Sequence, residues 1–116
     1  MELYGGLVVD DERLKKSSQF SLVYKRGKSE VTRFMVMYYL KNGFGYNRIG
    51  YSVSKKVGNS VVRNRSKRLM KEAVRLNSEN LKSGYDIVFI SRVKMNSATY
   101  KDAEKSVKKL MKPLRQ

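Results

Sequence analysis

The sequence predicts a single domain in which helices and strands pack in two layers. Three observations favour this fold: the length of 116 residues, the hydrophobic content of 41%, and segments of helical period that alternate with segments rich in β-branched and aromatic residues. A chain of this length can bury one modest core but not two independent ones. Its hydrophobic content argues against a disordered basic tail, because enough surface can be buried to offset chain entropy. We expect residues 13–116 to form the domain and residues 1–12 to form a loosely ordered arm.

A short helix is expected to open the domain. Ser17 and Ser18 can each act as its N-cap, and the apolar residues that follow have helical spacing. Gly27 is placed to end the helix. Residues 28–31 are a further candidate for a short edge strand.

Two strands are predicted next, joined by a tight turn. Residues 33–41 carry β-branched and aromatic side chains on both faces, so both sides of this strand should be covered. Residues 46–54 alternate apolar side chains with small or polar ones such as Gly50. The Asn42-Gly43 pair between the two strands is typical of a β-hairpin. The sequence therefore predicts that the two strands pair with each other.

The second half of the chain predicts a long helix, a buried strand and a final helix. Residues 58–60 precede an apolar stripe with a period of 3.6 residues, formed by Val62, Ser66, Leu69, Met70, Ala73 and Leu76. Residues 85–92 are rich in Ile, Val and Phe, as a buried strand would be. The last helix is expected to begin at Asn96-Ser97 and to stop near Pro113.

Charge gives the strongest indication of function. Lys and Arg number 26 against 10 acidic residues, for a formal net charge of +16. Eight of the basic residues fall within residues 55–75, which contain one acid, Glu72. A solvated helix without a partner is the alternative, but ordinary exposed helices intersperse the two signs. Because so much like charge repels itself, we expect this helix to bind a polyanion, with nucleic acid as the candidate.

The composition also bounds what the chain can do. It has no cysteine and no histidine, which excludes disulfides, and the longest apolar run, Phe34–Leu40, is too short to span a bilayer. The amino terminus carries acids where a signal peptide would carry positive charge, so a cytoplasmic protein is expected. The sole acidic cluster, residues 10–12, lies in the arm. We therefore predict no catalytic residues and no metal site from protein side chains.

The basic segment also carries a family resemblance. Residues 52–68, SVSKKVGNSVVRNRSKR, closely resemble the signature of the bacterial ribonuclease P protein component, with an Arg-Asn-Arg core at residues 63–65. Residues 13–17, with Phe20 and Tyr24 after them, look like the opening helix of that family. The resemblance covers about residues 13 to 112.

The resemblance implies both a fold and a function. The fold would be an α+β two-layer sandwich, with a mainly antiparallel sheet of three to four strands, helices packed on it and a left-handed β-α-β crossover. The function would be that of the protein subunit of ribonuclease P, a ribonucleoprotein endonuclease that removes the 5′ leader of precursor tRNA. Its catalytic RNA would perform the cleavage and require Mg²⁺, and the protein would bind both RNAs.

Two RNA surfaces follow from the resemblance and from the residues beside it. The family's helix residues correspond to Arg63, Asn64, Arg65, Lys67 and Arg68, which would contact the catalytic RNA, and helix geometry adds Lys71. The family's leader cleft has matching aromatic positions at Phe20, Tyr24 and Tyr38. The polar strand face and its end add Ser52, Ser54, Lys55 and Lys56. For Phe20 and Tyr24 the alternative is ordinary core packing, and the acidic, hydrophobic arm departs from the basic start that the family usually has.

Two other functions share the charge. A general RNA-binding or ribosomal protein would have no role in cleavage, and its affinity for substrate would not depend on leader length. A helix over residues 60–76 could instead lie on an anionic membrane, but its apolar stripe lacks large aromatic residues. We expect RNA partners and neither a membrane nor DNA.

Overall fold

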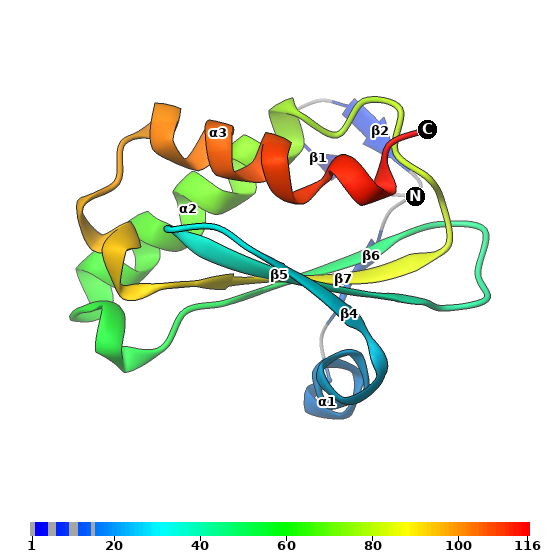
Figure 1. The fold of residues 1–116 in the computed structure, drawn as a ribbon, viewed down its shortest axis with the longest axis horizontal. Helices are drawn as coiled ribbons and strands as arrows, with labels where there is room; N and C mark the ends of the chain where they lie inside the picture. The colour runs from blue at the N-terminus through cyan, green and yellow to red at the C-terminus, as the bar shows by residue number, and fades with distance from the viewer. Residues whose placement is uncertain (1, 5–6, 10–11, 15) are drawn as a thin grey trace.

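The computed structural model describes residues 2–4, 7–9, 12–14 and 16–116, and it has helices on both faces of a twisted sheet (Figure 1). Its principal elements are β3 (Glu12–Arg13), α1 (Ser17–Arg26), β4 (Lys28–Val31), β5 (Met35–Lys41), β6 (Arg48–Ser52), α2 (Ser60–Leu76), β7 (Tyr85–Ser91) and α3 (Tyr100–Leu110). Helices α2 and α3 lie on one face of the sheet, and α1 lies on the other (Figure 1).

The sheet is mixed and is organised around β7. Its five strands have the order β3-β6-β7-β5-β4. Strand β7 pairs antiparallel with β5 and parallel with β6, so β6, α2 and β7 form a β-α-β crossover unit. Strand β4 pairs antiparallel with β5, and β3 adds a short parallel pairing with β6 that the sequence did not predict. The expected α+β sandwich and its edge strand at residues 28–31 are confirmed. The sheet has five strands where three to four were expected, and two of its four pairings are parallel, because β3 joins the edge of β6.

The predicted hairpin between β5 and β6 is wrong. Val88 of β7 lies between Tyr38 of β5 and Gly50 of β6, so β5 and β6 do not pair with each other. The connection therefore spans two strand spacings, about 10 Å. Gly43 does adopt the positive φ of 77° that a turn uses. A local turn signal cannot show that an apolar strand from much later in the chain inserts between its two flanks.

Alternating side chains divide the interior into two hydrophobic cores. On the side of α2 and α3, Met35, Met37 and Phe89 are fully buried within the larger core. On the side of α1, Val23 and Val88 are fully buried within a smaller one. The two-sided apolar pattern of residues 33–41 correctly predicted a strand that is covered on both faces.

Two helix starts differ from the sequence prediction. Helix α1 begins at Ser17 with Lys16 as its N-cap, and the Lys16 backbone N–H donates to Gln19 Oε1 at 3.1 Å. Its end is as predicted, since the Gly27 N–H donates to the Val23 carbonyl at 2.8 Å. Helix α3 begins after Thr99, whose side chain caps it, because Asn96-Ser97 belong to the preceding 3₁₀ segment η2 (Val93–Ser97).

Helix α2 begins where the sequence placed it. Asn59 is its N-cap, and its side chain accepts a hydrogen bond from the Val62 N–H at 3.0 Å. The apolar stripe holds along most of the helix but shifts at its end, where Val74 is buried and Leu76 is half exposed. The long basic helix is therefore fixed at its start by a cap and along its length by the larger core.

The segment before the domain contains a separate strand pair. Strands β1 (Glu2–Tyr4) and β2 (Leu7–Val9) pair antiparallel with each other. Residues 10 and 11 of the predicted acidic cluster lie outside the described residues, and the loose order of the arm stays a prediction. Across the described part of the chain, no helix is both long enough and apolar enough to cross a bilayer.

Candidate nucleic-acid interface

The outer face of α2 carries a shallow basic hollow. It has a volume of about 440 Å³ and is lined by Val61, Asn64, Lys67, Arg68 and Lys71. These residues are three or four positions apart, so they share one face of the helix. The structure therefore brings together four of the six residues predicted to contact the catalytic RNA.

Arg63 and Arg65, the other two residues of that prediction, are also held by the protein itself. Arg63 Nη1 donates to the Gly58 carbonyl at 2.9 Å, and Arg65 Nη2 donates to the Ala98 carbonyl at 2.7 Å. Arg65 thus ties α2 to the segment that leads into α3. Because a guanidinium has five N–H donors, neither bond prevents a further contact with phosphate. These bonds were not predicted from the sequence, although Arg65 borders the apolar stripe, where contact with the protein is expected.

Lys71, at the end of the hollow, is positioned by an aromatic residue of the sheet. Lys71 Nζ lies 5.9 Å from the centre of the Tyr51 ring, at cation-π distance. Glu72, the single acid of α2, forms an ion pair with Arg75. The negative charge of the helix is therefore matched by a neighbouring cation, and the hollow keeps its positive potential.

On the opposite face of the sheet, α1 brings three predicted aromatic residues together. The ring centres of Phe20 and Tyr24 are 6.4 Å apart, and those of Tyr24 and Tyr38 are 5.2 Å apart in an edge-to-face arrangement. Phe20 lies directly over Gly50, because a Cβ built on that glycine would be only 2.5 Å from Phe20 Cζ. The small face of β6 that the sequence predicted is thus the floor beneath Phe20.

Tyr24 is the most accessible member of this aromatic cluster, with 38% of its surface exposed. Burial raises the pKa of its phenol above the ordinary value of 10.0, and an interaction with the Ser52 hydroxyl acts in the opposite direction. Tyr24 is therefore uncharged at neutral pH and does not repel phosphate. Ser52 also joins the cluster from β6.

The core-packing alternative for Phe20 and Tyr24 is partly correct for Phe20, whereas Tyr24 is exposed. Phe20 and Tyr38 are half-buried and pack against the smaller core of Leu14, Val23 and Val88. Both rings also lie next to the exposed ring of Tyr24, Tyr38 edge-to-face and Phe20 at a tilt. They can therefore fix α1 on the sheet and still offer aromatic surface to a ligand.

The remaining predicted leader residues follow β6 towards α2. Ser54, Lys55 and Lys56 are all exposed, and the two lysines belong to the 3₁₀ segment η1 (Lys55–Val57). The Ser54 carbonyl accepts a hydrogen bond from the Val57 N–H at 3.1 Å, which fixes this turn. These residues follow Ser52 closely along the chain, at the end of β6.

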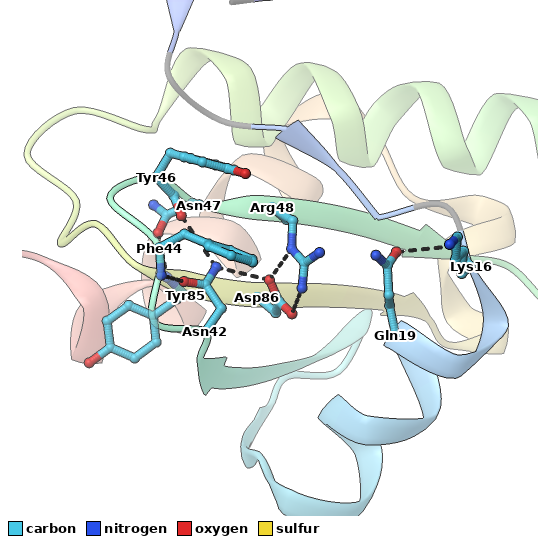
Figure 2. A network of polar contacts seen from close by, with 9 residues as sticks. All are labelled: Lys16, Gln19, Asn42, Phe44, Tyr46, Asn47, Arg48, Tyr85 and Asp86. Atoms are coloured by element: carbon cyan, nitrogen blue, oxygen red, sulfur yellow. Dashed lines mark hydrogen bonds and ion pairs between the residues drawn. The ribbon is translucent and has the colours of Figure 1, made fainter.

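A polar network at the other end of β6 was missed by the sequence analysis (Figure 2). Asp86 accepts from Arg48 Nε at 2.7 Å and from Arg48 Nη2 at 2.6 Å. Asn42 Nδ2 donates to Asp86 Oδ1 at 3.0 Å, and Asn42 Oδ1 accepts from the Phe44 N–H at 2.8 Å. Asp86 is 3% exposed. An acid at the start of an apolar strand was the available signal, since buried carboxylates need partners.

This network supports an aromatic stack. The Phe44 and Tyr46 rings are nearly parallel, with an interplanar angle of 6° and centres 5.3 Å apart. Arg48 Cζ lies 4.8 Å from the centre of the Phe44 ring. Within the described part of the chain, no three acidic side chains lie close enough together to hold a metal ion. The rings of Phe44 and Tyr46 and the guanidinium of Arg48 suit stacking and anion binding.

Comparison with known protein families places the chain among proteins of one description. The sequence model of the family described as Ribonuclease P matches residues 9–115. A ribonuclease P protein component from Clostridioides difficile is 57% identical over 100 residues, which are 85% of this chain and 88% of that protein. A ribonuclease P protein component from Caldanaerobacter subterraneus is 52% identical over 100 residues, with 86% of each chain covered.

Solved structures of the same description have the same fold. The RNase P protein from Thermotoga maritima superposes with a TM-score of 0.80 at 32% identity, covering 90% of this chain and 99% of that one. The RNase P protein from Staphylococcus aureus superposes with a TM-score of 0.79 at 33% identity, covering 87% of this chain and 93% of that one. The likeness therefore extends over nearly the whole of both chains.

Proposed function

Because this chain belongs to the ribonuclease P protein family, we propose that it is the subunit that binds the catalytic RNA of that ribonuclease together with the 5′ leader of precursor tRNA. The holoenzyme removes the leader and so produces the mature 5′ end of tRNA. In this proposal the RNA performs the cleavage in the bacterial cytoplasm. The protein binds and positions the two RNAs.

The observation that carries the proposal is the placement of two different surfaces on opposite sides of the sheet. The hollow on α2 combines three cations with the amide of Asn64, which suits the phosphates and base edges of a folded RNA. The cluster of Phe20, Tyr24 and Tyr38 offers aromatic surface. Stacking on such rings accepts any base, as an enzyme that processes many tRNAs requires.

Each surface has a distinct task in this assignment. The cations of α2 neutralise phosphates of the catalytic RNA and hold the protein in the holoenzyme. The aromatic cluster holds unpaired leader bases, while Lys55 and Lys56 hold leader phosphates at the end of β6. Mg²⁺ bound by the RNAs supplies the metal chemistry of cleavage. The protein side chains contribute orientation and charge neutralisation only.

The test is reconstitution with the cognate catalytic RNA and a precursor tRNA. The protein should accelerate cleavage at low Mg²⁺ and should tighten binding of substrates that carry a leader. Arg68→Ala should weaken assembly, because Arg68 is an exposed cation of the hollow. Phe20→Ala should instead weaken substrate affinity. If both variants weakened only assembly, the division into two surfaces would be wrong.

Salt dependence separates the two surfaces further. Each phosphate contact contributes about 0.7 to 0.9 to the slope of log affinity against log salt concentration. Lys67→Ala should therefore lower the slope for assembly by roughly one contact and leave the slope for leader binding unchanged. If the protein accelerated no cleavage and its affinity for substrate did not depend on the leader, it would be a general RNA-binding protein.

A further inference from the structure

We propose that Phe44, Tyr46 and Arg48 form a ledge that stacks one further unpaired base of the precursor tRNA leader. The ledge continues the surface formed by Phe20, Tyr24 and Tyr38. This inference rests on the proposed function, because it assumes that the aromatic cluster holds the leader. It assigns a role to the loop between β5 and β6, which contains none of the residues of the proposed leader site.

The ledge has the surface that a nucleobase requires. Phe44 is 45% exposed, although most large hydrophobic side chains in the described part of the domain are buried or half-buried. Its ring is stacked on Tyr46 and lies beside the guanidinium of Arg48. Exposed aromatic surface next to a guanidinium plane is the combination that stacks unpaired bases in single-stranded RNA sites, and here Phe44 is exposed while Tyr46 is half-buried beneath the same stack.

The ledge is held rigidly before any ligand arrives. The Asn42 side chain hydrogen-bonds both to the Phe44 backbone N–H and to Asp86. Both carboxylate oxygens of Asp86 accept hydrogen bonds from Arg48 (Figure 2). The loop also packs tightly against the turn before β7, because a Cβ built on Gly84 would lie 2.9 Å from the Phe44 carbonyl. A preorganised surface loses little conformational freedom on binding, so its contacts contribute to affinity.

Continuity with the aromatic cluster identifies the occupant. Arg48, Gly50 and Ser52 alternate along β6, so their side chains share the face on which α1 lies. Phe20 covers Gly50, and Tyr24 interacts with Ser52. A rise of about 3.3 Å per residue places Arg48 about 7 Å from Gly50 along the same line. A single strand lying over Gly50 would therefore reach the ledge with an adjacent nucleotide.

The position of the ledge sets which part of the leader it meets. The loop that carries it lies at the opposite end of the sheet from η1 and the start of α2 (Figure 1). The proposed contact with the catalytic RNA, which holds the cleavage site, begins at that other end. The ledge should therefore receive leader nucleotides far from the cleavage site. Asp86 does not oppose them, because Arg48 neutralises its charge.

A leader-length series tests the proposal. The reconstituted holoenzyme would be measured against precursor tRNAs whose leaders lengthen one nucleotide at a time from none. Substrate affinity would be compared for the wild type, Phe20→Ala, and the double variant Phe44→Ala with Tyr46→Ala. We expect the double variant to match the wild type on short leaders and to lose roughly tenfold in affinity once the leader reaches the ledge. Phe20→Ala should lose affinity on shorter leaders.

Two controls separate stacking from general damage to the loop. Phe44→Leu keeps an apolar side chain without an aromatic face and should behave like the double variant, whereas Phe44→Tyr should behave like the wild type. Val31→Ala shortens another exposed apolar side chain, 56% exposed on β4, and should change nothing at any length.

The outcomes distinguish this inference from the proposed function. If the wild type gains no affinity as the leader lengthens, the proposed function itself fails. If the wild type gains affinity and the double variant follows it at every length, the ledge is refuted while the leader site stands. If the double variant loses affinity equally with no leader at all, the ledge contacts another part of the RNA and the leader assignment is wrong.

Discussion

The sharpest test of the leader site is the substitution Gly50→Ala, which adds one carbon beneath Phe20. The new Cβ would lie 2.5 Å from Phe20 Cζ, 2.7 Å from Phe20 Cε1 and 3.1 Å from Leu14 Cβ. Ordinary carbon contacts are about 3.5 to 4.0 Å, so the ring has to retreat by roughly 1 Å. Phe20 also packs on the smaller core, which limits where its ring can go.

Both stability and binding should respond by a calculable amount. Adding a methyl group to a well-packed contact costs about 1 to 3 kcal/mol, and we expect the free energy of unfolding to fall by an amount in that range. Stacking of one base on an aromatic ring contributes about 1 to 3 kcal/mol. Displacing the Phe20 ring should lose a large part of that contribution. Since about 1.4 kcal/mol is tenfold in affinity, we expect a loss of roughly tenfold for a leader-bearing substrate.

The assay combines urea denaturation with two binding measurements. Affinity for precursor tRNA, with and without a short leader, should differ less in Gly50→Ala than in the wild type, and affinity for the catalytic RNA should be unchanged. Gly45→Ala is the matched control, because a Cβ there meets nothing within 4 Å. Full leader-dependent affinity in Gly50→Ala, despite reduced stability, would show that the position of the Phe20 ring is not used in binding.

Two further predictions concern arginine contacts. Arg65→Ala should lower the free energy of unfolding by about 1.5 kcal/mol, because the hydrogen bond from Arg65 to the Ala98 carbonyl is lost. Arg68 is also exposed but lines the hollow, so Arg68→Ala should change the free energy of unfolding by less than about 0.5 kcal/mol. Equal thermal melts of the two variants would refute a structural role for Arg65. Asp86→Ala leaves Arg48 largely buried without its carboxylate and should cost about 3 kcal/mol in urea denaturation. Glu72→Ala breaks a more exposed pair and should cost less than about 1 kcal/mol, so similar losses would contradict this reasoning.

Local features of the sequence predicted the elements that depend on local chemistry. Asn59 marked the start of α2, because an amide side chain at that position satisfies a helix N–H. The alternation of residues 46–54 correctly placed Gly50 on a small face, and that face is where Phe20 lies. Four of the six candidate RNA residues of α2 share one side of the helix because helical spacing alone sets that arrangement.

Features that depend on distant parts of the chain could not be predicted in this way. Nothing near Asn42-Gly43 shows that β7 inserts between the flanking strands. The bond from Arg65 to the Ala98 carbonyl joins residues 33 positions apart, and the pair of Arg48 with Asp86 joins residues 38 positions apart. The residues of both proposed RNA surfaces could therefore be grouped from the sequence, but the contacts that hold them in place could not.

The central position of β7 also determines when during synthesis the leader surface can exist. Its floor comes from β5 and β6, which hydrogen-bond to β7 and not to each other. Both strands leave the ribosome before β7, so a nascent chain that stops short of Ser91 has no template on which to align them. Such long-range pairing slows folding and leaves strand edges unpaired until the last strand arrives. A truncated chain would then carry most of the basic residues but no ordered leader surface, and its RNA binding would be indiscriminate.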